Sequence, residues 1–187
     1  KLYPYILSIT LAADNSYIDA TYSEPAYSNN NKTGAPDTSD ATIIFAQNGG
    51  NATNAIFTSF TQQDNTSESS ASALQAGATT ARAFLKITGT PSGVETISWK
   101  SRDNASFFDS LGNADPGTGQ VTPLVLNDQL APTISGTSLA SDNSTIAVTM
   151  SEAVFNTDGG SGALEVSDFA FSISGGLASL SSATPSS

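Results

Sequence analysis

The sequence repeats itself at an offset of 128 residues. Residues 2–24 align without gaps to residues 130–152, and twelve of these 23 positions are identical, including the turn segment Asp14-Asn15-Ser16. The same register continues to Ser39-Asp40, which matches Ser167-Asp168. A match that keeps its register this long indicates a tandem repeat, in which each copy is a folding unit.

The repeat predicts how the chain divides into domains. Residues 1–128 form one complete copy, residues 129–187 form the front part of a second, incomplete copy, and Asn127-Asp128-Gln129 is the linker. Half a sheet structure has open edges and half a core, which is unstable unless other sequence or another chain completes it. We therefore expect the natural protein to continue beyond Ser187.

Short β-strands fit this sequence better than helices. Only 12% of the residues are charged, whereas helices rely on Glu, Lys, Leu and Arg for their propensity. Alternating apolar residues between turn residues predict seven strands in the first copy and an all-β fold. These strands lie near residues 3–10, 16–22, 41–47, 54–61, 81–88, 94–100 and 120–127. The polar stretch 62–80 is predicted to be a long loop, which is either mobile or functional.

The same alternation predicts which side chains form the core. Ile18, Ala20 and Tyr22 share one face of their strand, and Ile97 and Trp99 share one face of another. Trp99 is the single tryptophan, and we expect it to be buried at the centre of the core rather than to stack on a sugar.

Composition excludes several classes of function. The net charge is −11 with six Lys plus Arg, so the chain has no basic surface for nucleic acid. It contains neither Cys nor His, which excludes Cys/His zinc sites, thiol nucleophiles and Ser-His-Asp triads. No apolar run is long enough for membrane insertion. We expect no catalytic function.

Four segments, taken in their order along the chain, carry a family resemblance. They are Asp14-Asn15-Ser16, Ser23-Glu24-Pro25-Ala26, residues 89–97 (GTPSGVETI) and residues 108–114 (FDSLGNA). In this order they resemble the tandem bacterial immunoglobulin-like repeats of large adhesins and other secreted or cell-surface proteins. The resemblance implies an immunoglobulin-like Greek-key β-sandwich, export to the extracellular space or the bacterial cell surface, and a spacer or adhesive role. The implied partners are neighbouring repeats and surface glycans or proteins.

Strand order suggests where carboxylates gather. If consecutive strands run antiparallel, the loops after the second, fourth and sixth strands share one end of the sandwich, and the linker leaves from the other end. The acidic end of copy two then faces the linker. Calcium binds six to eight oxygen ligands, so we hypothesise a calcium site that stiffens this joint. The candidate ligands are Glu24, Asp37, Asp40, Asp109, Asn113, Asn127, Asp128, Glu152, Asp158 and Asp168.

Three alternatives remain open at this point. Glu24 and Asp109 either hold their loops in place by accepting backbone N–H bonds or act as the acid and nucleophile of a glycosidase. A small repeated sandwich, however, offers no deep cleft for a sugar. Five tyrosines could form a carbohydrate-binding face, namely Tyr3, Tyr5, Tyr17, Tyr22 and Tyr27. Copy two keeps an aromatic ring at only one of the five equivalent positions. Self-assembly into an extracellular filament is the third alternative, with strands of a neighbour completing copy two.

Overall fold

The computed structural model describes residues 3–117 and 121–186. Within them the protein is all-β, apart from short 3-10 turns. Its contacts divide it into two compact units, Lys1–Leu130 and Ala131–Ser187, close to the boundary expected from the repeat. No helix in the described part of the chain is long and apolar enough to cross a membrane.

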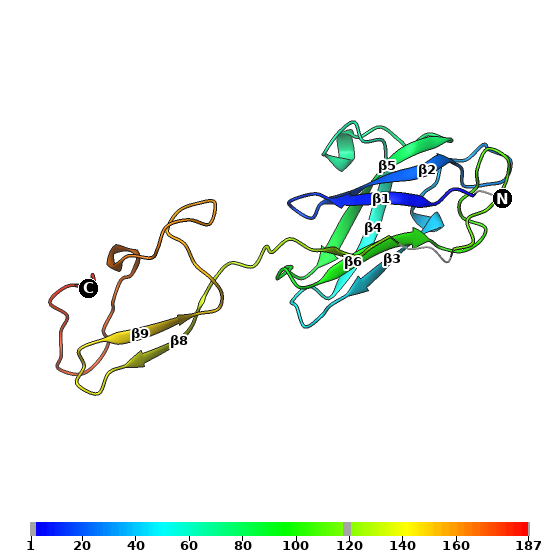
Figure 1. Ribbon diagram of the computed structural model, residues 1–187. Coiled ribbons are helices and arrows are strands. Elements are labelled where there is room, and N and C mark those ends of the chain that lie inside the picture. Colours follow the sequence, from blue (N-terminus) through cyan, green and yellow to red (C-terminus); the bar gives the residue numbers. More distant parts are fainter. Residues whose placement is uncertain (1–2, 118–120, 187) are drawn as a thin grey trace. The chain divides into compact units, whose positions relative to one another are not determined.

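The first unit consists of two antiparallel sheets (Figure 1). Strands of the first sheet lie in the order β1 (Ile6–Leu11), β2 (Tyr17–Ala26), β5 (Ala78–Thr88) and β4 (Asn54–Thr61). Strands of the second sheet lie in the order β3 (Ala41–Ala46), β6 (Thr96–Ser101) and β7 (Leu124–Val125). Each of the seven strands overlaps one of the predicted ranges.

The strands differ from prediction mainly at their ends. Strand β2 runs on to Ala26 because, beyond an irregularity in the ladder, Ala26 pairs with Ala78 at the start of β5. Strand β7 is only two residues long. Its predicted range began at Gln120, which lies outside the described residues.

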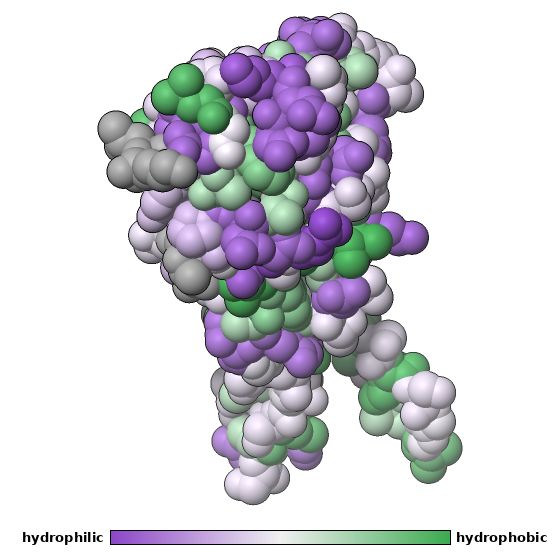
Figure 2. All heavy atoms as spheres, turned by 90° about the vertical axis from the view of Figure 1, so that its right-hand side faces the viewer, coloured by the Kyte–Doolittle hydropathy of each residue, from purple (hydrophilic) through white to green (hydrophobic). Residues whose placement is uncertain are grey.

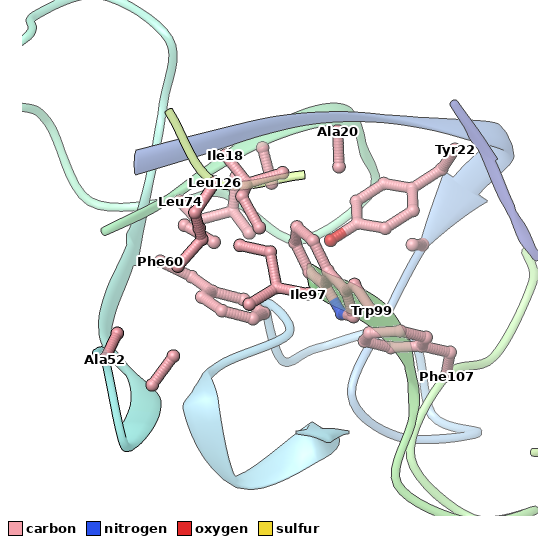
Figure 3. Packing of buried hydrophobic residues seen from close by; sticks show 14 residues of the cluster. Ile18, Ala20, Tyr22, Ala52, Phe60, Leu74, Ile97, Trp99, Phe107 and Leu126 are labelled. Atoms are coloured by element: carbon pink, nitrogen blue, oxygen red, sulfur yellow. The ribbon is translucent and has the colours of Figure 1, made fainter. Parts of the chain in front are cut away.

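The core lies between the two sheets and centres on Trp99, as predicted. Trp99, Ile97 and Ile18 are fully buried, and Ala20 and Tyr22 are nearly so. Tyr22 and Phe60 of the first sheet and Phe107, from the segment after β6, lie around the indole ring of Trp99, which belongs to the second sheet (Figure 3). The ring centroid of Trp99 lies 4.8 Å from that of Phe60 and 6.3 Å from that of Tyr22.

The long polar loop between β4 and β5 is held against the first sheet. The Gln63 side-chain amide donates to the carbonyls of Ala20 and Ala81, and Arg82 donates to the carbonyl of Asn65 over 2.7 Å. Arg82 also pairs with Asp19 on β2 through two N–H bonds of 2.6 and 2.7 Å. The loop therefore shields the outward face of β2 and β5. One turn of it is 3-10 helix η2 (Glu68–Ser70).

The polypeptide passes through the first unit lengthwise (Figure 1). Near the start of β1, the backbone N–H of Tyr5 donates to the hydroxyl of Ser23 over 3.1 Å. The other end of β1 leads into the turn at Asn15, whose side chain bonds the backbone of Asn127. The segment that precedes β1 and the segment that follows β7 consequently lie at opposite ends of the sheets.

The second unit consists of the hairpin β8 (Ile134–Leu139) and β9 (Ile146–Met150), the 3-10 helix η3 (Val166–Asp168) and irregular segments. The register of this hairpin is that of β1 and β2 moved by 128 residues, including the irregularity near its open end: Ile134 pairs Met150 as Ile6 pairs Tyr22, and Leu139 pairs Ile146 as Leu11 pairs Ile18. Unlike the first unit, it has no buried residue between 131 and 186.

Candidate functional site

The loops that follow β2 and β6 share one end of the first unit, as predicted. The N–H of Arg102 donates to the carbonyl of Asp40 over 2.9 Å, and Tyr27 forms a β-bridge with Phe108. Figure 2 views the first unit from this end, where hydrophilic residues cover most of the surface. The structure thus brings together the loops that carry Asp37, Asp40, Asp103, Asp109 and Asn113.

Asp37 and Asp40 form a reciprocal cap on 3-10 helix η1 (Thr38–Asp40). The Asp37 carboxylate accepts from the N–H of Ser39 over 2.7 Å, and the Asp40 carboxylate accepts from the N–H of Asp37 over 3.0 Å. Burial raises the pKa of Asp40, although the N–H of Asp37 lowers it in part. These carboxylates therefore order the entry into β3.

Asp109 is the most fully engaged of the predicted ligands. It is 2% exposed, and it accepts from the N–H groups of Leu111 and Asn113 over 2.7 Å each and from the Asn113 side chain over 2.6 Å. Burial opposes the charged form, but these hydrogen bonds outweigh it and lower the pKa of Asp109. Asp109 pins its loop, which was one of the two roles considered for it.

The other predicted ligands of the first unit lie apart from this group. Glu24 is half-buried within β2 rather than in a loop. Asn127 and Asp128 lie at the opposite end of the unit, where Gln129 donates its N–H to the carbonyl of Pro91. Asn127 and Asp128 are both exposed.

The predicted ligands of the second unit show a similar pattern. The Asp168 carboxylate accepts from the N–H of Glu165 over 2.8 Å, as Asp40 does from Asp37, and Asp158 is exposed in a loop. One carboxylate oxygen of Glu152 is shielded from solvent without a hydrogen-bond partner. Across residues 3–117 and 121–186, no three acidic side chains converge into a group that could hold a metal ion.

A side-chain clasp at the linker end was not predicted. Asn15 is 4% exposed and has a positive φ of 60°. Its amide donates to the carbonyl of Asn127 and accepts from the N–H of Asn127, both over 2.8 Å. The Asn127 side chain donates in turn to the carbonyl of Ala12 over 3.0 Å. The β1–β2 turn therefore fixes the segment through which the chain leaves the unit.

Glu95 is a second group that the sequence did not single out. It is fully buried and accepts from the N–H of Ala52 over 2.7 Å and from the N–H of Ser92 over 2.9 Å. Burial opposes ionisation, but these hydrogen bonds outweigh it and hold the pKa of Glu95 at about 2, below its usual 4.5. A Cβ at Gly50 would lie 2.3 Å from this carboxylate. Glu95 therefore ties the β3–β4 turn to the segment before β6.

An open polar groove of about 450 Å³ lies beside the loop between β4 and β5. Its lining combines side-chain amides, hydroxyls and one carboxylate, from Gln62, Gln63, Asp64, Gln75, Thr79 and Thr80 among others. The amides of Gln62 and Gln75 both donate to the carbonyl of Ala73. The lining thus offers mainly acceptor oxygens to a ligand that carries hydroxyl donors.

The tyrosines do not form one surface. Tyr22 is 3% exposed and contributes to the core, and Tyr17 lies beneath the guanidinium of Arg82, 3.7 Å from its ring centroid. Tyr3 and Tyr5 are exposed before β1. The stacking face considered from the sequence therefore lacks two of its five rings.

Comparison with known proteins finds no matching family model, no similar curated protein and no similar solved structure.

Proposed function

We propose that this chain is a non-catalytic structural or adhesive segment of an extracellular or cell-surface protein, built from tandem immunoglobulin-like repeats. The observation that carries the proposal is the recurrence, at an offset of 128 residues, of the same hairpin register. The recurrence extends to the turn residues: Asn15 and Asn143 have φ values of 60° and 59°. It extends also to the last residue of η1 and of η3, because Asp40 accepts from the N–H of Asp37 and Asp168 accepts from the N–H of Glu165.

The strand order of the first unit supports the immunoglobulin-like part of the proposal. With the strands lettered A to G along the chain, the order β1-β2-β5-β4 corresponds to A-B-E-D and the order β3-β6-β7 to C-F-G. This is the arrangement of constant-type immunoglobulin domains. The large core tryptophan lies on the F strand here, whereas antibody domains carry theirs on the C strand.

The lengthwise path of the chain supports the spacer role. Because the chain enters and leaves the first unit at opposite ends, units of this type joined in series extend a protein rather than fold back on it. The longest first-sheet strands have 10 and 11 residues, so each unit spans about 35 Å at 3.3 Å per residue. The Asn15 clasp fixes the exit segment, as a spacer under tension requires.

Single-molecule force spectroscopy tests the spacer role. The full chain is placed between marker domains and extended from both ends. We expect one cooperative rupture for residues 1–130, with a gain in contour length on the order of 40 nm, because about 130 residues become extended. Extension of the chain without a force peak would refute the proposal, since a load-bearing spacer resists extension as a unit.

A carbohydrate-binding module is the second candidate function, and the polar groove beside the loop between β4 and β5 supports it. Its acceptor oxygens suit the hydroxyl groups of a polysaccharide. A glycan array with the full chain distinguishes the two functions. Binding that Gln63→Ala and Gln75→Ala each abolish supports the module, and the absence of specific binding supports the spacer.

Calcium at the joint between repeats stays a prediction. Each ligand loop of the first unit is ordered by its own hydrogen bonds, so a calcium ion would depend on oxygen atoms that remain free. Those at the linker end, on Asn127 and Asp128, are exposed.

A further inference from the structure

Strand β3 has an open edge within the first unit. The strand order β3-β6-β7 places β3 at the side of its sheet, as the C strand is placed in constant-type immunoglobulin domains. The N–H of Arg102 donates to the carbonyl of Asp40, and alternate residues of an antiparallel strand bond to opposite neighbours. Counting from this bond, the residues that direct their backbone groups to the open side are Ala41, Ile43 and Phe45.

The other three edges of the first unit are protected. Strand β1 follows Pro4, and its pairing with β2 is irregular near its start. Strand β4 has an irregularity near its middle, and Thr61 at its end forms a bridge with Ala73 of the following loop. Strand β7 is two residues long and follows Pro123. Irregular pairing, prolines and short strands are means by which proteins prevent the addition of strands at an edge.

Strand β3 has none of these protective features. Its sequence, ATIIFA, contains no charged residue, proline or glycine, and it pairs with β6 in an unbroken register. Ile44, on its outer face, is 36% exposed. A regular, uncharged strand of this kind is a template for a further strand. Because the net charge of −11 opposes self-association of the chain, an uncharged edge is the place where a second copy meets the least repulsion.

A second copy of β3 fits this edge. If two copies run in opposite directions about a two-fold axis at Ile43, Ala41 of each copy lies opposite Phe45 of the other. The outward backbone groups of the two strands then meet along the whole edge. Thr42 lies opposite Ile44 of the second copy in a non-hydrogen-bonded pair, in which side chains approach closely. The strand is therefore complementary to itself.

The charges beside β3 are compatible with this pairing. Asp40, which precedes β3, lies beside Ala46 of the second copy, so no two carboxylates face each other across the joined strands. The offset of 128 residues places residues 169–174 (FAFSIS), which are also uncharged, at the equivalent position of the next repeat. Each repeat of a tandem array would therefore present an uncharged segment at this place.

We propose that the first unit binds a second copy of this chain through the edge of β3, with the two β3 strands antiparallel and the two sheets joined into one. Backbone hydrogen bonds supply affinity in this mode of binding. Because the chain enters and leaves the first unit at opposite ends, the two paired chains run in opposite directions, as chains attached to two facing surfaces do. This adhesive consequence rests on the proposed function, whereas the pairing depends on the first unit alone.

A matched pair of isoleucines tests the surface. Ile44→Lys adds a charge to the open edge, on the face that carries Lys100, whereas Ile56→Lys adds the same charge to the protected edge strand β4. Ile44 and Ile56 are 36% and 47% exposed, so neither substitution opens the core, and both change the net charge equally. Urea unfolding verifies that both variants fold like the original chain.

Sedimentation equilibrium of the full chain measures the association. We expect a monomer–dimer equilibrium in which Ile44→Lys raises the dissociation constant at least about tenfold, because both symmetry-related pairs of Thr42 with Ile44 are lost. Ile56→Lys should leave the dissociation constant unchanged or lower it slightly, because it reduces the net charge. A chain that stays monomeric at millimolar concentration, or a dimer that both substitutions weaken equally, overturns the inference.

Disulfide trapping tests the register, since the chain contains no Cys. A mixture of Thr42→Cys and Ile44→Cys chains should form cross-linked dimers on mild oxidation, because the two positions lie opposite each other. Each variant alone should cross-link less, because its two thiol positions lie on the diagonal at about 7–8 Å. Cross-linking of Ile44→Cys chains to each other in preference to Thr42→Cys chains contradicts the antiparallel pairing. The force measurement extends single chains, so it tests the spacer role independently of this pairing.

Discussion

At the scale of single residues, buried carboxylates in this protein organise loops. Glu95 and Asp109 are both shielded from solvent, and each carboxylate is held by backbone N–H groups. Hydrogen bonds to a charged group contribute about 1.5–3 kcal/mol each. Burial of these two acids is therefore compatible with stability, although neither has a cationic partner among the described residues.

Replacement of Glu95 tests this role. Glu95→Gln keeps the shape of the side chain but loses the charge, and we expect the free energy of unfolding at pH 7 to fall by about 2 kcal/mol. Because folding lowers the pKa of Glu95 from 4.5 to about 2, its contribution is complete above pH 4.5 and is lost as pH falls toward 2. Between pH 4.5 and pH 2, the Glu95→Gln variant should therefore lose less stability than the original chain. Urea unfolding at pH 7 and pH 3 measures both effects, with the exposed Glu68→Gln as control.

Replacement of Tyr22, in contrast to that of Glu95, is expected to stabilise the protein. Its hydroxyl is buried without a hydrogen-bond partner, and burial raises the pKa of Tyr22. Tyr22→Phe removes an unsatisfied polar group and keeps the ring that contacts Trp99. We expect the free energy of unfolding to rise by about 1 kcal/mol, measured by urea unfolding. A fall in stability would mean that the hydroxyl has a partner, and Tyr5→Phe, at an exposed ring, should change nothing.

At the scale of elements, the β1–β2 turn acts as a clasp in the first unit. Asn15→Gly keeps the positive φ that the turn requires but removes the three hydrogen bonds between the Asn15 side chain and Asn127. We expect a loss of about 2 kcal/mol in the free energy of unfolding. Asn143→Gly is the matched control, since the same turn recurs there without a side-chain partner in the described part of the chain. Equal effects of the two substitutions would contradict the clasp.

Periodicity predicted the strands best where burial alternates along the strand, as it does in β2. Alternation located Ile18, Ala20 and Tyr22 on the core side, and it located Ile97 and Trp99 in the facing sheet. The clasp and the Glu95 site were missed because each joins segments far apart in the sequence. Asn15 and Asn127 are 112 positions apart. Only the sheet topology brings them together, and no local pattern marks a buried Asn or Glu as different from an exposed one.

The positions of the candidate calcium ligands could likewise be predicted from the sequence only in part. Antiparallel strand order correctly predicted that the loops of Asp40 and Asp109 share one end of the first unit. It did not predict that hydrogen bonds within each loop would hold these carboxylates apart. Spacing locates a loop, but the direction of each carboxylate depends on which backbone N–H groups lie nearest.

At the scale of the whole molecule, the repeat predicts how calcium should act. If a joint between repeats binds calcium, a 100-fold excess over the dissociation constant stabilises the folded chain by about 2.7 kcal/mol. The melting temperature should then rise by on the order of 10 °C, and a chelator should reverse the rise. Glu152→Gln removes a ligand that only the second unit supplies, so it should abolish the rise if both units hold the ion. A rise that survives this substitution excludes Glu152 as a ligand, and equal melting temperatures in calcium and chelator refute the calcium hypothesis.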